Sequence, residues 1–360
     1  MSKIISTGTA LPAFKHSQDN ILGFMQDAYE LGADDKRKLK FLYHQGGIDT
    51  RYSAVPDYSV EKNEWEFYPA TPGMEPFPNL EKRMEWYNEK ATLLALAAIN
   101  NCLEKTKEKN ITHLITVSCT GMSAPGLDIE LMQLLNLPPS TFRTSINFMG
   151  CYAAIHALKI ADAFCTANKN ARVMIVCVEL CTLHFQKENT LENLTSSMLF
   201  ADGAAAVMVS GDDTQEGLLI NHFYSSIVHP GKKDMAWELS SKGFLMTLSS
   251  YVPELIKNNF DELLQSVLRE ANIEKDKITR WCIHPGGRKI LEAVQQSLHL
   301  EKNDLKESYE VLKEYGNMSS PTILFVLENI KKEIAYNKNE KIFGAAFGPG
   351  LTMETFILSA

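Results

Sequence analysis

Strand-like and helix-like segments alternate along almost the whole chain, and this alternation constrains the fold more than any single residue does. Residues 113–118 and 172–178 are rich in β-branched side chains, as expected of strands that are buried on both faces. Residues 91–103 and 152–164 instead repeat alanine and other apolar residues at helical spacing. The pattern predicts an α/β protein in which helices cover the sheets.

A polar stretch near the middle of the chain, residues 210–217, interrupts this alternation. We therefore predict two similar halves, 1–210 and 217–360, each contributing a strand followed by a functional turn. No strict sequence repeat relates them, so the similarity would be structural only. Residues 53–80 hold five prolines and many aromatic side chains, which predicts an ordered surface excursion rather than a regular element.

Composition excludes several classes of function. A net charge of −8 gives little electrostatic support to nucleic-acid binding. The apolar runs are too short to cross a membrane, and the first residues lack the apolar core of a signal peptide. Seven cysteines, an odd number, argue against a disulfide framework. We expect a cytoplasmic protein with reduced thiols and no membrane insertion.

One cysteine lies where a strand-like run meets an alanine-rich helical run. Cys151 follows Gly150, which permits a sharp turn, and precedes the predicted helix. A helix N-terminus stabilises an anion, so this position predicts a lowered thiol pKa and a reactive thiolate. The alternative is a buried core cysteine, which is our interpretation of the other six.

Two further polar residues occupy turns between predicted elements. His284 ends a short apolar strand and is followed by Pro-Gly-Gly. Asn317 follows Gly316, a predicted helix stop, and precedes a helix expected to begin with Ser320 as N-cap. Each has a structural alternative, a core histidine and a turn asparagine. Together with Cys151 they predict a nucleophile, its base and an amide donor for acyl transfer.

Two other interpretations of these residues were considered. Cys282 and His284 form a Cys-x-His pair, but no second ligand pair stands at zinc spacing, so no metal site is predicted. A papain-like protease also combines Cys, His and Asn, but the Cys-Gly-Ser-Cys-Trp element is missing here.

Together with these motifs, three further segments carry a family resemblance. They are residues 199–206 (Leu-Phe-Ala-Asp-Gly-Ala-Ala-Ala), 316–320 (Gly-Asn-Met-Ser-Ser) and 347–352 (Phe-Gly-Pro-Gly-Leu-Thr). The chain resembles the type III polyketide synthases, the chalcone-synthase-like branch of the thiolase superfamily, along nearly its whole length. The resemblance implies a thiolase-like αβαβα layered fold built from two similar halves, and a homodimer.

The resemblance also implies an acyltransferase that acts on free CoA thioesters without a permanently bound cofactor. Cys151 would take a starter acyl group from its CoA ester, with His284 holding the thiolate. His284 and Asn317 would stabilise the enolate formed when malonyl-CoA loses CO2. Repeated extension and cyclisation would give a pyrone or phenolic ring.

The residues around the substrate differ from the plant pattern. Phe200 matches the family's gatekeeper phenylalanine, whereas Met246 stands where a second one is usual. Trp237 replaces a small residue, which predicts an unusual cavity. The cavity residues implied by the resemblance are Phe200, Met246, Trp237, Cys181, His184, Ser319, Thr120, Gly348, Pro349 and Gly350.

CoA phosphates need cationic partners. Lys38 aligns with a CoA-contacting lysine of the family, although its charge run could equally be a solvated helix face. Arg51, Arg288 and Lys289 are further predicted CoA contacts.

Two alternatives to this function stay open. One is a ketoacyl-ACP-synthase-III-like condensing enzyme that uses carrier-protein substrates. The other is an inactive structural partner of another synthase. The starter acyl group, the number of extensions and the cyclisation route are not encoded by the motifs.

Overall fold

The computed structural model describes residues 2–334 and 339–360, and its centre is a nine-stranded mixed sheet. The strand order is β11-β12-β13-β8-β1-β7-β6-β4-β5. The strands are β1 (Lys3–Ala10), β4 (His113–Ser118), β5 (Phe142–Asn147), β6 (Arg172–Leu180), β7 (Asp202–Ser210), β8 (Leu218–Ile227), β11 (Arg280–Ile283), β12 (Lys341–Gly348) and β13 (Thr352–Ser359).

Two parts of this sheet meet at one short seam. Strands β1 and β8 pair only through Lys3 with Leu219 and Ile4 with Leu218. On one side of the seam lie β1, β7, β6, β4 and β5, and on the other lie β8, β13, β12 and β11. Each part can therefore twist separately and pack helices on both of its faces.

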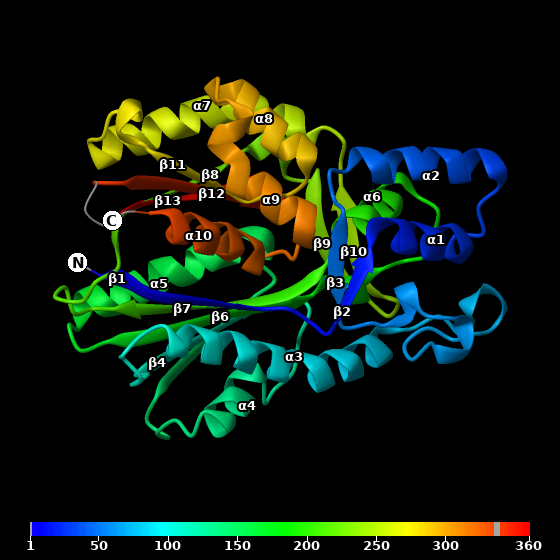
Figure 1. Cartoon of the computed structure of the whole chain (residues 1–360), viewed down its shortest axis with the longest axis horizontal. Helices are drawn as coiled ribbons and strands as arrows, with labels where there is room; N and C mark the ends of the chain where they lie inside the picture. Colours follow the sequence, from blue (N-terminus) through cyan, green and yellow to red (C-terminus); the bar gives the residue numbers. More distant parts are fainter. Residues whose placement is uncertain (1, 335–338) are drawn as a thin grey trace.

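Helices and sheet parts alternate through the molecule (Figure 1). Helices α5 and α10 lie between the two parts of the sheet, α3 and α4 cover one outer face, and α7 and α8 cover the other. The alanine-rich α5 contacts β6, β7 and β13, because its small side chains admit strands on both sides. These helices are α3 (Leu80–Glu104), α4 (Leu127–Leu134), α5 (Ala153–Ala167), α7 (Val252–Ala271), α8 (Arg288–Leu298) and α10 (Pro321–Glu333).

A smaller region lies beside one end of the layers (Figure 1). It holds two two-stranded sheets, β2 with β3 and β9 with β10. Three helices pack near them. The elements are β2 (Phe14–Ser17), β3 (Thr50–Ser53), β9 (Met235–Ser240), β10 (Gly243–Leu248), α1 (Gln18–Ala28), α2 (Ala33–Gln45) and α6 (Leu191–Leu199).

The α/β class predicted from the alternation is confirmed, and most element boundaries are close. Strand β4 has the predicted limits, whereas α3 begins at Leu80 rather than at residue 91. The side chain of Asn79 caps α3 by accepting from the Lys82 N–H. The division into halves at 210–217 stays a prediction.

The proline-rich excursion forms only short 3-10 turns after β3, as expected of an irregular segment. Several of its aromatic side chains are nevertheless buried in the main core, including Tyr58, Phe67 and Tyr68. None of the described helices is both long enough and apolar enough to cross a membrane.

Candidate active site

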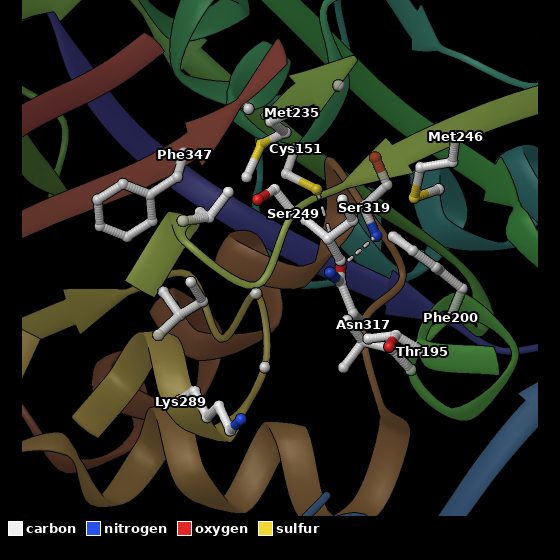
Figure 2. Close-up of a pocket in the computed structure, with 18 of the residues that line it drawn as sticks. Cys151, Thr195, Phe200, Met235, Met246, Ser249, Lys289, Asn317, Ser319 and Phe347 are labelled. Atoms are coloured by element: carbon white, nitrogen blue, oxygen red, sulfur yellow. Dashed lines mark hydrogen bonds between the residues drawn. The ribbon is translucent and has the colours of Figure 1, made fainter. Parts of the chain in front are cut away.

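A largely enclosed cavity of about 280 Å³ brings together the three residues that the sequence singled out. Cys151, His284 and Asn317 all line it, although they come from three separate turns. Figure 2 shows Cys151, Ser319 and Asn317 beside one another at its centre. Most of the surrounding side chains are apolar, so charges and dipoles inside act with little screening by water.

Cys151 lies in a 3-10 turn, Gly150–Tyr152, directly ahead of α5. This is the helix-start position predicted for it. Gly150 has φ +74°, and a Cβ atom there would lie 2.4 Å from Cδ of Pro349. Only glycine suits both the left-handed backbone and this close approach, so the turn that holds Cys151 packs against the β12–β13 connection.

The thiol of Cys151 differs from the sequence expectation. Burial raises its pKa to about 11, although hydrogen bonding with Ser319 and Asn317 acts in the opposite direction. The predicted lowering of this pKa is therefore wrong. The sequence showed the helix start but not the desolvation, which disfavours the thiolate more than the helix terminus and the hydrogen bonds favour it.

Asn317 is held in one orientation by its own turn. Its Oδ1 accepts a hydrogen bond from the Ser319 N–H at 2.8 Å and lies 3.9 Å from Sγ of Cys151. Because the backbone N–H needs the oxygen, the amide NH2 is left as the group that can donate to a ligand. Gly316 closes α9 (Lys306–Tyr315) ahead of it with φ +69°, the helix stop that was predicted.

His284 follows β11 directly and is 1% exposed. Neither of its ring nitrogens has a hydrogen-bond partner among the described residues. Burial lowers its pKa to about 3, so the imidazole is neutral. The site therefore combines a neutral imidazole with a neutral thiol rather than the ion pair that the resemblance implies.

Most of the predicted cavity residues line this cavity, and three do not. Trp237 and Met246 lie directly opposite each other in the β9–β10 ribbon and both line it. Thr120, His184 and Gly350 are not part of its wall. The remaining members of the predicted set that line the cavity are Phe200, Cys181, Ser319, Gly348 and Pro349.

The predicted CoA contacts separate into two groups. Arg288 and Lys289 line the cavity at the start of α8. Lys38 is paired with Asp35 on an exposed face of α2 and is not part of the lining.

The prediction for Arg51 is wrong, because its side chain is 2% exposed and lies in the interior. Strand β3 carries it against Gln18 and the carbonyl of Phe200, away from solvent-borne phosphates.

Sequence reasoning missed a buried carboxyl group behind Cys151. Glu179 accepts hydrogen bonds from the Cys119 N–H and from the hydroxyls of Thr120 and Ser320. Burial raises its pKa to about 7, against the lowering effect of these bonds. A single glutamate after the apolar run 173–178 of β6 was the signal that could have revealed it.

Two other predictions near this carboxyl group need correction. Ser320 is the N-cap residue of α10, as predicted, but its hydroxyl bonds Glu179 and does not cap the helix. Cys119, interpreted as a simple core cysteine, lines the cavity, and its Sγ accepts from the Gly150 N–H at 3.0 Å.

Comparison with known proteins agrees with this architecture. Residues 1–213 match the family model for chalcone and stilbene synthases, N-terminal domain, and residues 221–360 match the corresponding C-terminal domain. Type III polyketide synthase A of Arabidopsis thaliana is 30% identical over 368 residues, covering 99% of this chain and 92% of that protein. Probable polyketide synthase 1 of Dictyostelium discoideum is 27% identical over 366 residues, which are 98% of this chain but 11% of that protein.

Solved structures show the same similarity. PKS-I from the brown alga Ectocarpus siliculosus superposes with a TM-score of 0.91 at 29% identity, covering 99% of this chain and 98% of that one. The C-terminal type III polyketide synthase domain of Steely1 from Dictyostelium gives 0.89 at 25% identity, covering 99% of each chain. Both halves of the sequence and the whole layered fold thus agree: the chain belongs to the chalcone and stilbene synthase family and is a type III polyketide synthase with a thiolase-like fold.

Proposed function

We propose that this synthase loads an acyl group from a CoA thioester onto Cys151, extends it with malonyl-CoA and cyclises the product. The observation that carries the proposal is the convergence of Cys151, His284 and Asn317, from three distant segments, on one enclosed cavity. Arg288 and Lys289, which line the same cavity, are suited to bind CoA phosphates. Homodimeric assembly and a cytoplasmic location belong to the same proposal.

Loading begins with transfer of the Cys151 proton to the neutral imidazole of His284. Sγ attacks the carbonyl carbon of the acyl-CoA, and a thioester to the enzyme forms as the bond to the CoA sulfur breaks. The imidazolium returns the proton to the departing CoA thiolate. Burial keeps the imidazole neutral, so its nitrogen is free to accept the proton, but the lowered pKa makes it a weak base that returns the proton readily.

Condensation uses malonyl-CoA in the same cavity. Loss of CO2 leaves its electron pair on the thioester enolate, whose oxygen accepts hydrogen bonds from Asn317 and His284. The nucleophilic carbon attacks the acyl carbonyl on Cys151, a carbon–carbon bond forms, and the bond to Sγ breaks. The released thiolate takes up one proton from solvent. Each cycle thus consumes one malonyl-CoA and one proton, and releases CO2 and CoA.

The cavity size favours short products. About 280 Å³ is near the lower end of ligand pockets, which span roughly 300–1,000 Å³. The bulk of Trp237 contributes to this limit. A small pyrone or phenolic ring is the product class that we propose.

The test is incubation of the purified protein with malonyl-CoA and a panel of acyl-CoAs, followed by mass spectrometry of products and of the Cys151 peptide. We expect CoA release without any carrier protein. Cys151→Ala should abolish product, by about 10⁴-fold or more. Cys165→Ala is the matched control and should keep its activity, because Cys165 lies on α5, the helix that follows Cys151, and is buried away from the cavity. Product formed equally by Cys151→Ala, or only with a carrier protein, would contradict the proposal.

A further inference from the structure

A buried arginine outside the catalytic cavity contacts two segments of the cavity wall. Arg83, near the start of α3, is 0% exposed and is not part of the cavity lining. Its hydrogen-bond partners among the described residues are two backbone carbonyls and no carboxylate. Burying a charge without an opposite charge is costly, and a side chain that only fills space would not need one.

The guanidinium group holds the 3-10 turn Cys181–His184. Its Nη1 donates to the carbonyl of Leu183, within that turn, and its Nε donates to the carbonyl of Pro78 at 3.0 Å. The turn belongs to the cavity wall, because Cys181 lines the cavity. Arg83 therefore fixes one wall segment to the start of α3, and its planar fork of donors sets the directions of both bonds.

The same guanidinium packs against the hairpin of the β9–β10 ribbon. Gly243, the first residue of β10, has φ +117°, and a Cβ atom there would lie 2.7 Å from Nε of Arg83. Any larger residue would have to displace the hairpin or the arginine. The backbone of α3 reaches the hairpin as well, because the Leu80 N–H donates to the carbonyl of Ser241 at 3.1 Å. The start of α3 thus contacts the ribbon at two points.

Gln186 links the two wall segments to each other. It lies just after the turn, and its Nε2 donates to the carbonyls of Lys242 and Phe244, both at 3.3 Å. The ring of Phe244 stacks on His184, within the turn, with centroids 4.6 Å apart. Since β9 and β10 pair with no third strand among the described residues, contacts of this kind position the ribbon.

We propose that Arg83 is a positioning residue for the extension reaction. By holding the Cys181–His184 turn and the ribbon in place relative to α3, it sets where Trp237 and Met246 meet the growing chain. The inference rests on the proposed function and adds to it a residue that touches neither the substrate nor the reacting atoms. Because the cavity holds only about 280 Å³, a small shift of either wall segment changes the chain length that fits.

A purely structural role for Arg83 makes different predictions. If it only stabilised the fold, its loss would lower every step of the reaction through loss of folded protein, and the ratios between products would stay the same. If it positions the wall, loading of Cys151 and decarboxylation of malonyl-CoA persist, while the products change. Product ratios and the rates of the separate steps, measured per molecule of folded protein, therefore separate the two roles.

The experiment compares Arg83→Met with the wild-type protein. Methionine is unbranched, but it donates no hydrogen bond to Leu183. With malonyl-CoA and the best starter of the acyl-CoA panel, the ratio of longer to shorter products should change by about tenfold or more. The rate of malonyl-CoA decarboxylation should stay that of the wild type. Lys82→Met is the matched control, because it removes a charge from the neighbouring, exposed position of α3 and should leave the product ratio unchanged.

Hydrogen–deuterium exchange gives a readout that does not depend on activity. In Arg83→Met, the amides of the Cys181–His184 turn and of the ribbon should exchange about tenfold faster or more, because both lose contacts with the guanidinium. The amides of α5, which follows Cys151, should be unchanged. Arg83→Lys keeps the charge and can donate to one carbonyl, so it should restore part of the protection and part of the wild-type product ratio.

Gln186→Met tests the same wall from the other side. It removes both hydrogen bonds to the hairpin and leaves Arg83 in place. It should loosen the ribbon and change the product ratio as well, and it decides the proposal if Arg83→Met does not fold.

Each outcome bears on the proposal. Unchanged product ratios in Arg83→Met, or in Gln186→Met where the first variant does not fold, would overturn it. Equal losses in loading, decarboxylation and extension would also overturn it, since they mean a structural role only. Unchanged exchange in the turn and the ribbon would show that Arg83 holds neither. If the wild-type protein forms no product with any starter, the proposed function fails, while exchange still decides whether Arg83 holds the wall.

Discussion

The two sides of the catalytic cavity are built in different ways. His284 and Asn317, on one side, are 1% and 2% exposed and lie in turns fixed by buried strands and helices. Trp237 and Met246, on the other, stand in the β9–β10 ribbon, which pairs with no third strand among the described residues. A two-stranded ribbon depends on packing for its stability and tolerates changes of side chain more readily. We propose that the residues of the core carry the chemistry and that the ribbon sets the shape of the cavity.

The largest effect is expected from Asn317→Ala, which tests the role that we propose for a residue of the buried core. It removes the amide donor that we assign to the enolate oxygen, so the condensation rate should fall by about 10²- to 10³-fold. Loading of Cys151 should change little, because that step does not use this donor. Single-turnover loading and steady-state condensation, measured on the same preparation, separate the two effects.

Asn317→Asp is the matched control for the fold of this turn. It keeps an oxygen that accepts from the Ser319 N–H, but it removes the amide hydrogens. It should fold normally and lose condensation as the Ala variant does. Full activity in Asn317→Asp would show that Asn317 only shapes the turn.

The second test concerns the protonation state of the Cys151 thiol. A thiol with its pKa raised to about 11 is protonated at neutral pH, so the thiolate fraction rises with pH. Alkylation of Cys151 by iodoacetamide should therefore accelerate about tenfold per pH unit across the neutral and moderately alkaline range. Mass spectrometry of the modified Cys151 peptide, in protein without CoA, gives the rate.

A different pH profile would reverse this conclusion. A rate that is already at its plateau near neutral pH, and loses that plateau in His284→Ala, would mean a thiolate–imidazolium pair in the resting site.

The smallest effect on rate is expected from a change in the β9–β10 ribbon. Trp237→Gly should enlarge the cavity and change the chain length or ring type of the product, with only a modest effect on the rate of malonyl-CoA decarboxylation. Glu238→Gly is the control, because it places the same flexible residue on the opposite, exposed face of β9 and should leave the products unchanged. If Trp237→Gly leaves the product profile unaltered, the β9–β10 ribbon does not determine the shape of the cavity.

Prediction from sequence succeeded where the signal was local. The turn that holds Asn317 follows from Gly316 and Pro321, which stop one helix and start the next. Cys151 was placed at a helix start for a similar reason, since Gly150 and the alanine-rich run adjoin it in the chain. These features depend on backbone preferences of neighbouring residues and not on distant contacts.

Prediction failed where burial decides the role of a polar group. Arg51 is the single basic residue of its local segment and follows polar residues, yet β3 carries it into the interior against Gln18. Glu179 was overlooked because its partners, Thr120 and Ser320, lie 59 and 141 residues away along the chain. Such contacts form only when strands from different parts of the sequence come together.

The sequence by itself determined the α/β class, the three turns that carry Cys151, His284 and Asn317, and the family, because each depends on local patterns of apolar residues, glycine and proline. Only the tertiary structure decided that the thiol and the imidazole are both neutral, since desolvation depends on everything packed around them. It also decided that Arg51 is buried against Gln18 and the carbonyl of Phe200, because segments distant in the sequence must pack together before these groups meet.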